Sequence, residues 1–183
     1  MNKGKRFAIV LNVSSELLKR GSWCGETHIQ KAVFLLQQLL GVDIDCDFIL
    51  YKHGPFSFEL RDSLTEMIAN GLIEEVIRKA DYGPTLIPAA ESDRFLERFP
   101  KTLAKYSSQI QFIANWIRDK NVGELERLTT AAYVIQSHEN VDYEEIAHEI
   151  IRVKPHISMQ EARGAIGEAQ LMIRAAKQYK YEA

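Results

Sequence analysis

The chain has 183 residues, 46% hydrophobic and 26% charged, as is usual for a globular protein. Its length suits one domain or two small lobes sharing a core, and its composition excludes a disordered tail, a collagen-like fibre and a small disulfide scaffold. Residues 1–88 hold 10 basic and 11 acidic side chains, and residues 89–183 hold 13 and 14. Neither half therefore has the positive charge that is typical of a nucleic-acid-binding domain.

The sequence contains no apolar run near the roughly 18 residues that a membrane-spanning helix needs. The basic residues 1–6 are followed by an interrupted apolar segment without a cleavage site, so we do not interpret them as part of a signal peptide. We expect a cytoplasmic protein with no membrane partner. In a reducing compartment Cys24 and Cys46 are expected to be free thiols.

Apolar residues spaced three and four apart predict helices over residues 6–19 and 27–40. The second helix begins with the letters of a capping box, in which Thr27 is the N-cap and Gln30 lies three positions on. Alternating apolar and polar residues then predict a short strand over residues 48–51.

A Gly54-Pro55 corner interrupts the chain after this strand, and Ser57 is expected to cap a third helix that ends near residue 70. Residues 72–79 and 85–87 are predicted to form a two-stranded hairpin. The order of helix, helix, strand, helix and hairpin is typical of a winged helix-turn-helix.

The rest of the chain has a helical pattern throughout. Helices are predicted over residues 92–99, 101–118 and 124–137. Two more helices are expected to begin at capping boxes. The first box is Asp142 with Glu145, stapled by Val141 and Ile146, and the second is Ser158 with Glu161. The alanines of the last helix allow close packing on its own core or on a second copy, which leaves a homodimer open. We therefore predict a mostly α (α+β) protein, with a winged-helix-like module in residues 1–88 and a helical extension in residues 89–183.

Several segments resemble a known family. Residues 29–36, IQKAVFLL, resemble the LQKLLYF helix of the Panacea domain, the domain of SocA-type antitoxins. Residues 48–57 resemble its strand and GP-x-S corner, and residues 71–73 resemble the GLI that opens its wing. The C-terminal part is similar to the YwgA-like bacterial and archaeal proteins through residues 125–134 and 153–158. The resemblance implies a winged helix wrapped by further helices, and an antitoxin or adaptor that binds a protein partner such as a toxin.

The sequence offers little for catalysis or cofactor binding. It has no HExxH, no CxxC, no phosphate-binding glycine loop and no nucleophile elbow. Glu145 and His148 have the spacing of one arm of a di-iron site, but no second ExxH completes it. We expect no catalytic, cofactor-binding or metal-binding residues, and no enzymatic activity; an enzyme with an unrecognised site is the weakest hypothesis.

Aromatic side chains on a rigid corner are good anchors for a protein interface. The candidate partner-binding residues are Trp23, Tyr51, Lys52, His53, Gly54, Pro55 and Phe56. The structural alternatives are that Tyr51 and Phe56 fill the gap between the strand and the third helix, and that Trp23 packs on the first helix.

The alternative function is a DNA-binding regulator, because the third helix of a winged helix enters the major groove. Here that helix has Arg61 as its one basic residue against Glu59, Asp62 and Glu66, and a net charge of −2 opposes approach to phosphates. The candidate DNA contacts are Lys52, Arg61, Arg78 and Lys79.

Overall fold

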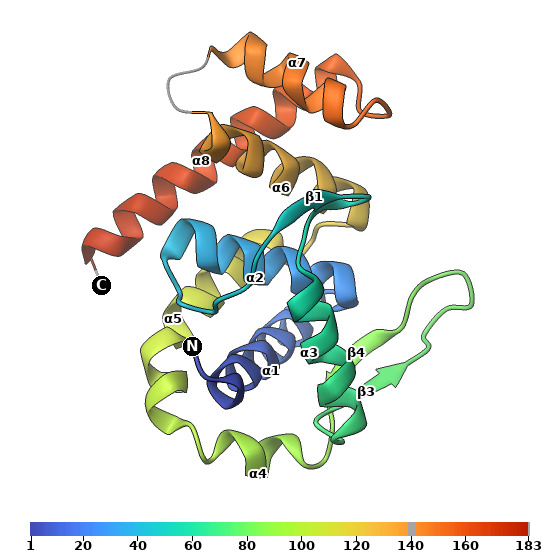
Figure 1. The fold of residues 1–183 in the computed structure, drawn as a ribbon, viewed down its shortest axis with the longest axis vertical. Coiled ribbons are helices and arrows are strands. Elements are labelled where there is room, and N and C mark those ends of the chain that lie inside the picture. Colours follow the sequence, from blue (N-terminus) through green and yellow to red (C-terminus); the bar gives the residue numbers. More distant parts are fainter. Residues whose placement is uncertain (139–141, 183) are drawn as a thin grey trace.

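The computed structural model describes residues 1–138 and 142–182, which are mostly helical with two small antiparallel hairpins (Figure 1). The helices are α1 (Lys3–Lys19), α2 (Glu26–Leu40), α3 (Phe58–Ala69), α4 (Ser92–Leu96), α5 (Pro100–Ile117), α6 (Val122–Ser137), α7 (Tyr143–Val153) and α8 (Met159–Glu182). The strands are β1 (Ile49–Tyr51), β2 (Gly54–Phe56), β3 (Ile73–Val76) and β4 (Thr85–Pro88). The predicted α+β class with a majority of helix is confirmed.

Helix α1 is buried on nearly every side because α2, α4, α5 and β4 pack around it. Helix α5 also contacts α2, while α6, α7 and α8 pack against one another above α2 (Figure 1). One hydrophobic core therefore contains residues from both the first 88 positions and the helical remainder. The alanines of α8 at positions 162, 165, 169 and 176 are buried, so this helix packs on its own chain.

The predicted capping box at the start of α2 is wrong. The N-cap is Gly25, which places Thr27 inside the helix, and no side chain caps this end. Gln30 turns instead to the backbone of Ser57: its Nε2 donates to the Ser57 carbonyl at 2.9 Å, and Ser57 N–H donates to its Oε1 at 3.0 Å. The buried amide thus ties α2 to the start of α3.

Two further capping predictions have different outcomes. Asp142 is the N-cap of α7 but makes no capping hydrogen bond, and Val141 of the predicted staple lies outside the described residues. Ser158 and Glu161 do form a reciprocal box before α8, with Ser158 N–H donating to Glu161 Oε2 at 2.9 Å. The Ser57 cap of α3 is also confirmed, since its hydroxyl accepts from Leu60 N–H at 3.2 Å.

The β1–β2 hairpin extends the single predicted strand. Its register pairs Ile49 with Phe56 and Tyr51 with Gly54, and β2 packs on α6 and α2. The second hairpin, β3–β4, was predicted; β4 packs on α1 and β3 on α3, and the loop between the two strands extends outward (Figure 1). None of the helices in the described ranges has the length and apolarity needed to cross a bilayer.

Candidate docking surface

An exposed group of apolar side chains lies on the β1–β2 hairpin and at the start of α3. This hairpin patch consists of Ile49, Tyr51, Phe56 and Phe58. Its three rings contact one another, with centroids 5.2 Å apart for Phe56–Phe58 and 5.6 Å apart for Tyr51–Phe56. Ile49, Tyr51 and Phe58 are nevertheless 49%, 42% and 38% exposed. Large apolar side chains gathered in the open are typical of contact surfaces.

Gly54 and Pro55 are buried beneath this patch rather than offered to a partner. Gly54 has φ +85°, a conformation that suits glycine, and a Cβ atom there would lie 3.1 Å from the Thr130 hydroxyl and 3.2 Å from that of Thr129. The hairpin can approach α6 this closely because glycine has no side chain. The corner therefore sets the position of the patch.

A set of buried charges, the buried charge cluster of Lys31, Glu126 and Lys154, lies under the hairpin. Lys31 on α2 is 1% exposed, and its Nζ donates to the carbonyl of Pro55 at 2.7 Å. Lys154, which follows α7, donates to the carbonyls of Tyr51 and Lys52. Its Nζ lies 3.1 Å from Glu126 Oε1 on α6. Lys31 and Lys154 thus bond the hairpin backbone from two parts of the chain, and Glu126 on a third pairs with Lys154.

The cluster contains two ammonium groups and one carboxylate. Burial lowers the pKa of Lys31 to about 7, an effect that Glu126 opposes and Lys154 adds to. Two exposed histidines border the carboxylate: His53 Nδ1 lies 3.6 Å from Glu126 Oε2, and His156 Nε2 lies 3.3 Å from Oε1. Near pH 7 the charge of the cluster therefore depends on the protonation of Lys31.

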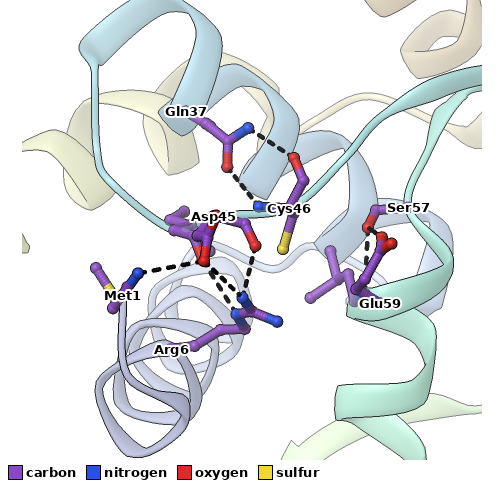
Figure 2. Close-up of polar contacts among 9 residues, drawn as sticks. Met1, Arg6, Gln37, Asp45, Cys46, Ser57 and Glu59 are labelled. Carbon is purple, nitrogen blue, oxygen red and sulfur yellow. Dashed lines mark hydrogen bonds and ion pairs between the residues drawn. The ribbon is translucent and has the colours of Figure 1, made fainter.

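Polar contacts also fix the chain that leads into β1 (Figure 2). The Arg6 guanidinium donates from Nε to the Ile44 carbonyl at 3.0 Å, and Met1 N lies 3.3 Å from Asp45 Oδ2. Gln37 donates to the Cys46 carbonyl at 2.8 Å and accepts from its N–H at 3.1 Å. On the other side, Ser57 donates to the Glu59 carboxylate at 2.8 Å, which lowers the pKa of that carboxyl.

Trp23 lies apart from the hairpin patch, and it packs on the β3–β4 hairpin. Its Nε1 donates to the Gly83 carbonyl at 3.0 Å, and its ring centroid is 5.2 Å from that of Tyr82. Both rings line a cleft of about 700 Å³ between α3, this hairpin and the starts of α2 and α6. Three acidic and three basic side chains line it, so the cleft has no preferred charge: Glu26, Glu75, Asp119, Arg61, Arg118 and Lys120.

The candidate DNA contacts come from three elements. Lys52 lies in the turn of the first hairpin, Arg61 on α3, and Arg78 and Lys79 in the loop after β3. Arg61 contacts Asp62 at 3.3 Å and lies 4.9 Å above the Phe58 ring, and Lys79 lies 4.7 Å above the ring of Tyr82. Two of the four cations are therefore held by neighbouring side chains.

The remaining nucleophiles and ligand types are scattered. Cys24 and Cys46 are both free, as predicted, and both are buried; burial raises the pKa of the Cys24 thiol to about 11. In the described parts of the chain, no three His, Cys, Asp or Glu side chains are grouped as they would be around a metal ion. Glu145 and His148 are both exposed on α7.

Comparisons of the chain with family models, curated proteins and solved structures found no match.

Proposed function

We propose that this is a non-enzymatic, cytoplasmic protein-binding module, an antitoxin or adaptor that holds its partner on the hairpin patch. The observation that carries the proposal is the exposure of Ile49, Tyr51 and Phe58 on a hairpin whose backbone is anchored from below. An anchored aromatic surface loses little conformational entropy on binding, so its apolar contacts translate into affinity. The resemblance to SocA-type antitoxins makes a toxin the first candidate for the partner.

The order of elements supports a winged-helix-like module. Helices α1, α2 and α3 precede the β3–β4 hairpin, which would be the wing, and α4 to α8 would form the extension around it. In this interpretation α3 would be the DNA-reading helix, yet it carries the exposed Glu59 and Asp62 and the half-buried Glu66. Their charge disfavours a duplex and is compatible with a protein partner.

The test is recovery of a stoichiometric partner from the native host with three tagged proteins. The wild type and Leu171→Ser, which changes a 56% exposed residue on α8, should both retain the partner. The double variant Tyr51→Ser/Phe58→Ser should lose it, because removing two central anchors weakens binding by roughly a hundredfold or more. Circular dichroism checks that each variant is folded. Equal recovery by all three proteins, or no stoichiometric partner, would contradict the proposal, as would failure to rescue growth from a genetically adjacent toxin.

The second candidate, a DNA-binding regulator, is distinguished by a gel shift with the chain's own upstream region at low salt. Sequence-dependent retardation that is lost on replacing Lys52, Arg61, Arg78 and Lys79 would favour the regulator over the protein-binding module. A homodimer would double this small basic set, so the oligomeric state should be measured in the same samples by light scattering.

A further inference from the structure

Both lysines of the buried charge cluster donate hydrogen bonds to the backbone of the same hairpin, β1–β2. Lys31 bonds the carbonyl of Pro55, and Lys154 bonds the carbonyls of Tyr51 and Lys52. These residues belong to β1, β2 and the turn between them, which carry most of the hairpin patch. The ammonium groups reach the hairpin from α2 and from the segment after α7, so they hold it against two separate helices.

The Glu126 carboxylate is the counter-charge of the two buried lysines. Its side chain is 7% exposed and pairs with Lys154, and it also favours the charged form of Lys31. Two buried ammonium groups without a counter-charge would repel each other at a high cost in a low-dielectric interior. Moving the hairpin outward would let water reach both ammonium groups. If the carboxylate is removed, hairpin opening should therefore relieve their repulsion.

We infer that Lys31, Glu126 and Lys154 are positioning residues of the docking surface, a proton-linked clamp that holds the β1–β2 hairpin closed and so fixes the hairpin patch. The clamp acts on the hairpin patch, and its effect on partner binding rests on the proposed function. The position of the hairpin itself can be measured without any partner.

The clamp is linked to protons through Lys31. In the closed hairpin this amine is buried among Glu126, Lys154 and the more distant Glu26, with His53 and His156 bordering Glu126. In the opened hairpin it meets water and binds a proton more readily. Opening is then coupled to proton uptake, so the opening constant should fall as the pH rises above about 7, by up to about tenfold per pH unit.

The experiment is amide hydrogen exchange of residues 49–54 in the full chain, corrected for the intrinsic rate at each pH. Glu126→Gln is the test variant. Glu16→Gln is its matched control, because Glu16 is also a buried carboxylate paired with two cations, Lys19 and Arg20, but lies on α1 away from the hairpin. We expect at least about tenfold faster exchange of the hairpin amides in Glu126→Gln and wild-type exchange in Glu16→Gln.

Two further variants complete the test. Lys154→Met removes the donors to two hairpin carbonyls and should also speed hairpin exchange, which keeps the inference testable if Glu126→Gln does not fold. Lys31→Met should remove the pH dependence of opening, whereas Glu16→Gln should keep it. Unchanged hairpin exchange in both Glu126→Gln and Lys154→Met, or the same pH dependence in Lys31→Met as in the wild type, would overturn the clamp. If hydrogen exchange confirms the clamp but no partner is recovered, the result counts against the proposed function and not against the clamp.

Discussion

Replacing Lys31 by methionine should change how the stability of the protein depends on pH. The ordinary pKa of a lysine is 10.5, and burial lowers that of Lys31 to about 7. Between these two values the unfolded chain holds a proton on Lys31 that the folded chain has released. Because stability rises with pH wherever the unfolded state binds more protons, the free energy of unfolding should increase from about pH 7 upward.

The magnitude follows from the two pKa values. Integrating the proton difference from about pH 7 to about pH 8.5 gives a gain of roughly 1 to 2 kcal/mol. The range ends there because burial also raises the pKa of Cys24 and Cys46. Their thiols ionise first in the unfolded chain, so stability falls again above about pH 9. Lys31→Met keeps these thiols and loses only the amine.

The assay is urea unfolding of the wild type and Lys31→Met at several pH values across this range, followed by circular dichroism. The wild type should gain stability with pH, and Lys31→Met should show a nearly flat profile. The variant also leaves the Pro55 carbonyl without its donor, so it is the slope, not the absolute stability, that reports on the amine. Parallel slopes in the two proteins would refute the reasoning, because Lys31 would then be protonated in the fold.

Three other predictions can be checked with the same proteins. Gly54→Ala should lose about 1–3 kcal/mol in urea unfolding, since it combines a positive φ with contact to Thr130, whereas Gly164→Ala in open space on α8 should gain about 0.5–1 kcal/mol. Gln30→Ala leaves the buried N–H of Ser57 unpaired, while the Ser57 carbonyl keeps its bond from Arg61 N–H, and should cost roughly 1–3 kcal/mol in the same assay. Cys24 should resist iodoacetamide in the native protein and react on unfolding, as mass spectrometry of the labelled chain would show.

The local elements were largely predictable because their signals are local. The Ser57 cap and the box of Ser158 and Glu161 depend on residues three apart, and each forms as expected. Thr27 and Gln30 also have the residue types and the spacing of a capping box, but the Gln30 amide bonds the backbone of Ser57, 27 residues away. Conversely, a box of Asn121 and Glu124 does open α6, and its Asn-x-x-Glu signal was present in the sequence but missed.

The hairpin patch was predicted only in part. Tyr51 and Phe56 were named from the corner, but β2 was not, because a Gly-Pro pair signals a break rather than a strand. Without β2, Ile49 could not be placed opposite Phe56, and Phe58 on the first turn of α3 had no neighbouring rings to join. Knowing the pairing would have been enough to find the patch.

The buried charge cluster could not be predicted from the sequence at all. Lys31 lies in an amphipathic helix, where a lysine is ordinarily expected in solvent. Glu126 and Lys154 come from elements about 100 residues further along the chain, and nothing local links them to the corner. The three side chains come together only when α6 and the segment after α7 pack over α2.

The cost of this cluster is itself an argument for its role. A buried ion pair is often no more stabilising than apolar residues of the same volume, and an unmatched second ammonium is worse. Apolar side chains could fill the space, but they could not hold the carbonyls of Tyr51, Lys52 and Pro55 at fixed points. The arrangement exchanges stability for a defined hairpin position, and a defined position matters most where the hairpin carries exposed contact residues. We therefore expect a variant with Lys31, Glu126 and Lys154 all replaced by apolar residues to remain folded while its hairpin amides exchange faster than those of the wild type.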